Sequence, residues 1–198
     1  MFIRPEENQG AEDALARWYG QQEKAWGYMP NYAALFAGRP DVAEAWTRLN
    51  LTIRDGMDRR RFELATIAAA RSRSSTYCTA AHAKFLRDVC SDESTMSALA
   101  SDPTGSSLDP VDQAVVVFAA KVATDPASVG SGDVAQLREQ GLTDADIADV
   151  IFAVAARCFF ATALDASGAE PDWQLGDAFD SGTRAQLAVG RPFSTMGE

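Results

Sequence analysis

The feature that most constrains this fold is a long apolar stretch in the C-terminal half of the chain. From Val150 to Phe160 almost every residue is apolar, and Thr143 and Asp146 precede the stretch in the pattern of a capping box. A helix that is apolar on all sides has to be buried. We therefore expect a helix over residues 143–164, either at the centre of the fold or at an interface between subunits.

The sequence predicts a series of helices in the rest of the chain. It is rich in alanine, which favours helices, and no run of alternating apolar and polar residues predicts a strand. Residues 91–108 are polar and contain Pro103 and Gly105, so we expect a loop with at most one helical turn. Apolar spacing, prolines, glycines and capping residues predict helices over 11–26, 32–37, 40–54, 59–73, 76–89 and 110–124, and a short one that Ser131 caps and Gly141 ends.

These elements predict one all-α domain. The 198 residues, 46% hydrophobic and 23% charged, suit a single unit with a real core. We assign residues 1–175 to a helical domain with an N-terminal helical extension. Residues 176–198 are more polar and bear glycines, so we expect an extended or partly helical tail that is packed on a neighbouring element or frayed.

The net charge and the number of cysteines disfavour several classes of protein. A net charge of −10 disfavours binding to nucleic acid or to anionic lipid. No apolar stretch reaches the ~20 residues that span a bilayer, and the N-terminus lacks the pattern of a signal peptide. We therefore predict a cytoplasmic protein without membrane contact. Three cysteines do not make a disulfide framework, so we expect reduced thiols, either buried or reactive.

The single histidine points to a thiol site. His82 follows Cys78 by four residues, a spacing that places two side chains on one helix face with β-carbons ~5–6 Å apart. An imidazole there could take the thiol proton or stabilise the thiolate, which is the nucleophile. If Ser75 is the N-cap, Cys78 lies in the first helical turn, where free amides and the helix dipole favour negative charge.

Glu63 is the candidate third member of this site. It lies within the otherwise apolar segment 62–67, and a carboxylate among core residues needs a partner. His82 would gain a fixed tautomer and higher basicity from it. We predict a relay from Glu63 through His82 to Cys78, with Ser75 and Tyr77 in support. The alternative is an ordinary ion pair between Glu63 and Arg59 or Arg60 on the same helix.

Each of these candidate residues could instead have a purely structural role. Cys78 and His82 could be ordinary buried residues, Ser75 only a helix cap, and Tyr77 only a packing residue. We expect Cys90 and Cys158 to be structural, and Trp18, Trp26 and Trp46 to be core or interface residues. No ligand set for a metal, glycine-rich phosphate loop, or haem or flavin signature is visible, so we predict no cofactor.

The spacing of Glu63, Cys78 and His82 resembles the signature of the alkylhydroperoxidase D-like, or carboxymuconolactone decarboxylase, superfamily. In that signature a glutamate precedes a C-x-x-C pair and a histidine follows the second cysteine by four residues. The segments 27–31, 38–41, 109–110 and 136–147 also resemble the family, so the likeness covers about residues 26–173 and is greatest to its peroxidase-related members. It implies an all-α fold, a homo-oligomer of two or more subunits, and an antioxidant enzyme with peroxiredoxin-type activity.

One departure from the signature matters for the chemistry. The first cysteine of the pair is replaced by Ser75, which excludes a disulfide cycle between these two positions. Cys90 lies twelve residues beyond Cys78, ~18 Å along a continuous helix, whereas disulfide-bonded α-carbons lie within ~7 Å. Whether Cys158 approaches Cys78 is left open. A route through a sulfenic acid that an external thiol resolves stays available.

Three functional hypotheses follow from the resemblance. The first is reduction of a small-molecule peroxide, with Cys78 as nucleophile, His82 as proton relay, Glu63 as its orienting group and an external thiol as reductant. The second is a lyase of the carboxymuconolactone decarboxylase type, acting on a small carboxylated lactone. The third is a helical oligomer without catalytic activity.

Overall fold

The computed structural model describes residues 1–196, which form helices and connecting loops with no strand among them. The predicted all-α class is therefore confirmed for these residues. The elements are α1 (Glu12–Trp26), η1 (Asn31–Phe36), α2 (Pro40–Gly56), α3 (Arg59–Ser72), α4 (Thr76–Asp88), α5 (Glu93–Ser101), α6 (Pro110–Thr124), η2 (Pro126–Ser128), α7 (Ser131–Glu139), α8 (Asp144–Ser167), α9 (Trp173–Asp177) and α10 (Ser181–Leu187), where η marks a 3₁₀ helix.

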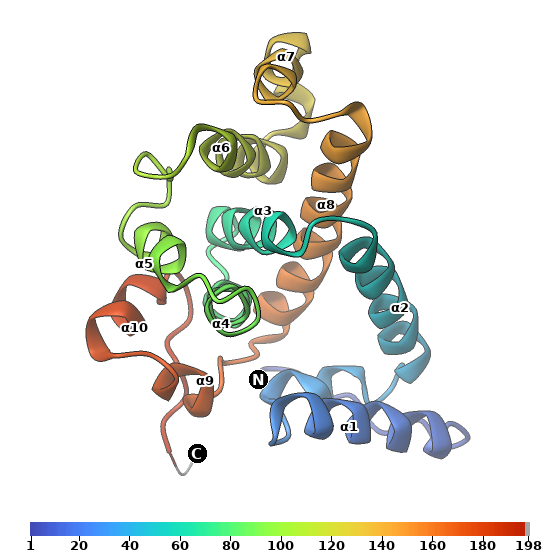
Figure 1. Cartoon of the computed structure of the whole chain (residues 1–198). Helices are drawn as coiled ribbons and strands as arrows, with labels where there is room; N and C mark the ends of the chain where they lie inside the picture. Colours follow the sequence, from blue (N-terminus) through green and yellow to red (C-terminus); the bar gives the residue numbers. More distant parts are fainter. Residues whose placement is uncertain (197–198) are drawn as a thin grey trace.

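Helix α3 lies at the centre of the molecule. It packs against α4, α6 and α8, as Figure 1 shows. Every residue from Phe62 to Ala70 is buried, including Glu63 and Thr66. Four alanines in this segment leave room for neighbouring helices to approach closely. The side chain of Asp58 caps the helix by accepting from the Arg61 amide at 2.7 Å.

Helix α8 is the long apolar helix expected from the sequence. Thr143 and Asp146 form the predicted capping box, and the helix ends at Gly168, which adopts the left-handed conformation with φ of 76°. One face is buried against α3, α6 and α2, while Phe152 and Phe159 on the other face are 55% and 49% exposed. The helix is thus a core element on one side and a surface on the other.

Length and composition would allow α8 to cross a membrane, so the expectation that no apolar stretch is long enough is wrong. Asp149 precedes the apolar stretch and Arg157 interrupts it, but the helix as a whole remains apolar enough. Half of its most apolar window is buried inside this chain, as is usual for the core helix of a globular fold.

The predicted loop over residues 91–108 is wrong in its first half, which forms α5. Asp92 caps this helix by accepting from the Thr95 amide at 3.1 Å, and the buried side chains of Met96 and Leu99 anchor it. It packs against α4 and α10, contacts that local sequence does not reveal. Ser131 is likewise not a cap: Gly130 occupies the N-cap position, and its amide donates to Asp133 at 2.7 Å.

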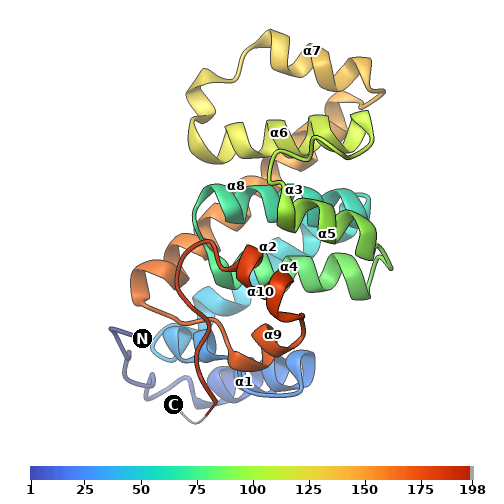
Figure 2. The same ribbon diagram turned by 90° about the vertical axis from the view of Figure 1, so that its left-hand side faces the viewer.

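The C-terminal segment packs against α4 and α5, as Figure 2 shows for α9 and α10. Beyond α10 the chain passes the N-terminal end of α4, where the Gly190 amide donates to the Thr76 hydroxyl at 2.8 Å. A β-carbon at Gly190 would lie 1.8 Å from the Ser74 carbonyl oxygen. Up to Met196, the last residue that the structure describes, this segment contains helices that pack on α4 and α5.

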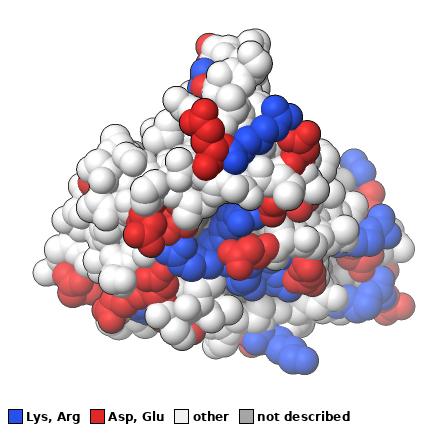
Figure 3. Space-filling view, turned by 45° about the horizontal axis from the view of Figure 1, so that its top comes forward, with Lys and Arg blue, Asp and Glu red and all other residues white. Residues whose placement is uncertain are grey.

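Acidic and basic side chains are interspersed on the surface shown in Figure 3. Ion pairs also join the helices, since Arg60 pairs with Asp92 at 2.6 Å and with Asp112 at 2.7 Å and so links α3, α5 and α6. The large negative net charge is therefore not gathered into one acidic patch on this face.

Candidate active site

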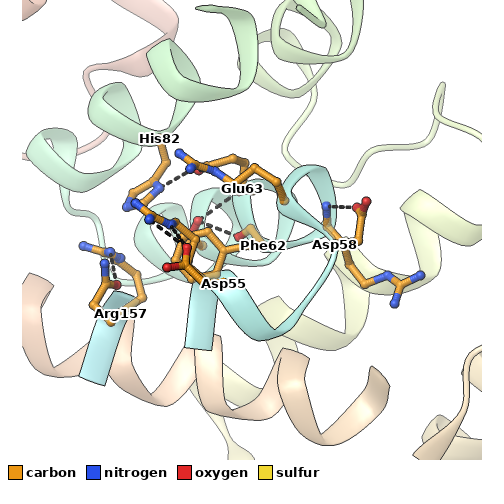
Figure 4. A network of polar contacts seen from close by, with 11 residues as sticks. Asp55, Asp58, Phe62, Glu63, His82 and Arg157 are labelled. Carbon is orange, nitrogen blue, oxygen red and sulfur yellow. Dashed lines mark hydrogen bonds and ion pairs between the residues drawn. The ribbon is translucent and has the colours of Figure 1, made fainter. Parts of the chain in front are cut away.

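Glu63 lies on the central helix with its side chain fully buried. Its Oε2 is 2.5 Å from Nδ1 of His82 on α4, and its Oε1 accepts from Arg59 Nε at 2.6 Å. Figure 4 shows the imidazole reaching from α4 toward this carboxylate. Both pairings proposed from the sequence thus occur together, and Arg60 takes no part in them because it binds Asp92 and Asp112.

Burial and neighbouring polar groups together set the protonation states of Glu63 and His82. Burial lowers the pKa of His82 to about 4, and the nearby Arg157 guanidinium acts in the same direction, outweighing the opposite effect of Glu63. Burial opposes ionisation of Glu63, but His82 and Arg59 together hold its pKa below the ordinary value. Near neutral pH the carboxylate is therefore charged and the imidazole neutral.

The tautomer of His82 follows from this arrangement. An ionised carboxylate only accepts hydrogen bonds, so Nδ1 must carry the imidazole proton. Nε2 then has a free lone pair, and it is the ring nitrogen available to accept a proton from another group. The pair can therefore act as an oriented general base.

Cys78 lies in the first turn of α4, two per cent exposed. Ser75 is at the N-cap position as expected, but its buried side chain makes no capping hydrogen bond. The Cys78 sulfur accepts from Arg157 Nη1 at 3.6 Å, and among the hydrogen bonds of residues 1–196 this is its only side-chain partner. A direct bond between His82 and Cys78 is not formed in this state, although both residues line the same cavity.

Arg157 is the site residue that the sequence analysis missed. It comes from α8 and is four per cent exposed. Its Nη2 donates to Asn50 Oδ1 on α2 at 3.3 Å, and its guanidinium lies over the rings of Trp46 and Phe160 at 5.5 and 5.6 Å. The signal was present in the sequence, since Arg157 is the one charged residue between Val150 and Phe160.

The cavity between these residues has a volume of about 220 Å³. Seven aromatic side chains form part of its wall and pack on one another: Trp46 stacks on Phe160 at 4.9 Å, and Tyr32 meets Phe160 edge to face at 5.3 Å. The aromatic lining residues are Trp18, Trp26, Tyr32, Trp46, Tyr77, Phe85 and Phe160. A larger hollow of about 650 Å³ near the N-terminal segment contains none of the predicted site residues.

Tyr77 contributes mainly by holding the wall of the cavity. Its hydroxyl donates to Asp172, which also accepts from the Tyr28 hydroxyl at 3.3 Å and from the Asn31 amide at 2.8 Å. Burial, together with Asp172, raises the pKa of Tyr77 well above its ordinary value, so the phenol stays protonated. These bonds connect the start of α4 to η1 and to the start of α9.

Cys90 and Cys158 are partly buried free thiols outside the cavity lining, and burial raises the pKa of both. Cys78 is therefore the thiol that the cavity presents. Within residues 1–196 no group of three or more histidine, cysteine, aspartate or glutamate side chains could hold a metal ion.

Comparisons with known proteins confirm the predicted alkylhydroperoxidase D-like class of the fold. Residues 40–102, which contain the three predicted site residues, match the carboxymuconolactone decarboxylase family. No protein of curated function matches the chain.

Solved structures resemble the chain over nearly its whole length. An uncharacterised peroxidase-related protein with an alkylhydroperoxidase D core from Ralstonia eutropha JMP134 is 21% identical, with a TM-score of 0.75 over 96% of this chain and 99% of that one. A peroxidase-related protein from Silicibacter sp. TM1040 is 19% identical, with a TM-score of 0.72 over 88% and 89%. The debrominase Bmp8, as a cysteine-to-alanine variant in complex with 2,3,4-tribromopyrrole, is 16% identical, with a TM-score of 0.70 over 94% and 96%.

Proposed function

We propose that this chain, whose residues 40–102 match the carboxymuconolactone decarboxylase family and whose fold resembles that of a protein with an alkylhydroperoxidase D core, is a thiol-dependent peroxidase that reduces small organic hydroperoxides at Cys78. The observation that carries this proposal is a buried thiol lining the same small cavity as a neutral imidazole that a carboxylate orients. A nucleophile, a base and an orienting group are the parts that an activated thiol requires.

In the proposed reaction His82 Nε2 accepts the proton of Cys78, either after a small side-chain adjustment or through a water molecule. The thiolate attacks the outer oxygen of the hydroperoxide, so an S–O bond forms while the O–O bond breaks. The leaving alkoxide takes the proton from His82 and departs as an alcohol. Cys78 is thereby oxidised to a sulfenic acid, and the peroxide is reduced.

Regeneration has to use a thiol from outside the chain. Ser75 occupies the position of a resolving cysteine, and neither Cys90 nor Cys158 lines the cavity. One external thiol condenses with the sulfenic acid, releasing water and forming a mixed disulfide. A second thiol then reduces that disulfide and restores Cys78.

The test is turnover of an organic hydroperoxide, such as tert-butyl hydroperoxide, with dithiothreitol as reductant. Cys78→Ser should abolish turnover and the trapping of a sulfenic acid by dimedone, whereas Cys90→Ser should retain both. His82→Gln should slow the reaction about a hundredfold, the usual contribution of a general acid–base group. Full activity in the Cys78→Ser protein would refute the proposal.

A second candidate function is removal of halogen from a small halogenated aromatic compound. The aromatic walls of the cavity and its single thiol favour it, and the debrominase Bmp8 shares the fold. The thiolate would take the halogen while the ring carbon gains a proton, and two external thiols would then release halide and re-form Cys78. Halide release from 2,3,4-tribromopyrrole, in the absence of activity on hydroperoxide, would favour this candidate over the first.

A further inference from the structure

Arg157 is a buried cation without a carboxylate partner. Among the ion pairs formed by residues 1–196, none includes it. Its contacts are the Cys78 sulfur, the amide oxygen of Asn50 and two aromatic ring faces, and its Nε has no hydrogen-bond partner. A charge removed from water is costly unless it is paired, so this guanidinium needs a counter-charge.

The counter-charge has to enter through the cavity. Glu63, the nearby carboxylate of the site, is already bound by Arg59 and His82. The rings of Trp46 and Phe160 lie against the guanidinium, and ring faces attract a cation but do not satisfy its N–H donors. The Cys78 thiolate can supply one negative charge, yet it contacts only Nη1.

We propose that Arg157 binds an oxyanion of the substrate, and that the cavity selects small aromatic molecules carrying one negative charge. A guanidinium offers several N–H donors in a fixed plane, which suits a carboxylate or phenolate group. The aromatic walls suit a planar body, and a volume of about 220 Å³ limits its size. This inference names the substrate class of the site assigned above and so rests on that proposed function.

The rates at which iodoacetate, an anion, and iodoacetamide, a neutral reagent, alkylate Cys78 distinguish anion binding from activation of the thiol. In both reactions the thiolate attacks the methylene carbon, an S–C bond forms and iodide leaves. The ratio of the two rates is therefore independent of the amount of thiolate, and it reports the preference for an anionic reagent. Measuring it in a Cys90→Ser, Cys158→Ser background confines the reaction to Cys78.

The proposal predicts a higher iodoacetate-to-iodoacetamide ratio for this protein than for glutathione. Arg157→Met should lower the ratio about tenfold, the effect of losing one charge-assisted hydrogen bond. Arg157→Lys should retain part of the preference. Arg48→Met makes the same charge change at an exposed position of α2 and should leave the ratio within about twofold of the unmodified value.

A second readout uses the unmodified protein and does not depend on how the variants fold. Benzoate should protect Cys78 from iodoacetamide, and the neutral benzamide should protect it much less. Equal protection by both, or rates for the two alkylating reagents that fall equally in Arg157→Met, would overturn the oxyanion site. Either result leaves the peroxidase proposal standing, because hydroperoxide turnover is measured separately.

Discussion

At the scale of single residues, the site depends on a histidine that is kept neutral by burial. Glu63 does not make His82 a cation, because burial and Arg157 together outweigh it. The carboxylate instead fixes the tautomer, which leaves Nε2 as a proton acceptor on the cavity side of the pair. Arg157 places a positive charge beside the Cys78 sulfur. Because a guanidinium stays protonated, Arg157 does not transfer a proton in the reaction.

The low pKa of His82 predicts how stability depends on pH. The unfolded chain binds a proton on this histidine near pH 6.5, whereas the folded protein binds it only near pH 4. The stabilisation is therefore complete above pH 6.5 and is lost as the pH falls from 6.5 to 4. It amounts to about 3 kcal/mol over that window.

Urea unfolding at a series of pH values checks this prediction. In His82→Gln the free energy of unfolding should vary less between pH 6.5 and 4 than in the unmodified protein. The lowered pKa of Glu63 acts in the same direction at lower pH, so a residual slope near pH 4 is expected in both proteins. An identical pH dependence of the two proteins across the whole window would show that His82 is not buried in the neutral form.

At the scale of secondary-structure elements, the C-terminal segment supports the helix that carries Cys78. Gly190 approaches Ser74 so closely that no side chain fits between them, and its amide binds Thr76 in the first turn of α4. The position of the thiol therefore depends on a segment more than a hundred residues away in the chain.

Gly190→Ala should therefore destabilise the protein by about 1–3 kcal/mol, because the added methyl group overlaps the Ser74 carbonyl. It should also change the alkylation rate of Cys78, because the start of α4 has to shift. The matched control is Gly132→Ala on α7, where a β-carbon meets nothing within 4 Å. Thermal unfolding of the two variants provides the comparison, and equal melting temperatures would contradict the proposed support.

The sequence predicts those elements whose signals are local. The Asp58 cap and the Thr143–Asp146 box are readable because their partners lie three residues away. Helix α5 was missed because Met96 and Leu99 become core residues only where α4 and α10 cover them. Arg157 stands out as the one charge in an apolar stretch, but its partner Cys78 lies 79 residues away and periodicity carries no information about such a contact.

At the scale of the whole molecule, α8 has one face packed in the interior and an opposite, apolar face that is exposed. Phe152 and Phe159 are about half exposed on that face, and Ile151 is 37% exposed beside them. Large apolar side chains that cluster on a surface mark sites of protein contact. We propose that this face of α8 forms the subunit interface of a homo-oligomer of two or more chains.

Light scattering after size-exclusion chromatography tests the assembly. The unmodified protein should have a mass of at least twice 21.2 kDa, and a Phe152→Glu, Phe159→Glu variant should have a smaller mass while retaining its helical circular dichroism. Charges on an interface built from aromatic side chains oppose association. A monomeric mass for the unmodified protein would contradict the assignment of this face.

The central claim is that His82 is a neutral base with its proton on Nδ1, held there by Glu63. Because His82 is the only histidine of the chain, its two ring nitrogens can be observed without overlap by ¹⁵N NMR. Across a pH titration we expect the Nδ1–H tautomer near neutral pH and protonation only near pH 4. An Nε2–H tautomer, or a titration centred near the ordinary value of 6.5, would contradict this account of the site.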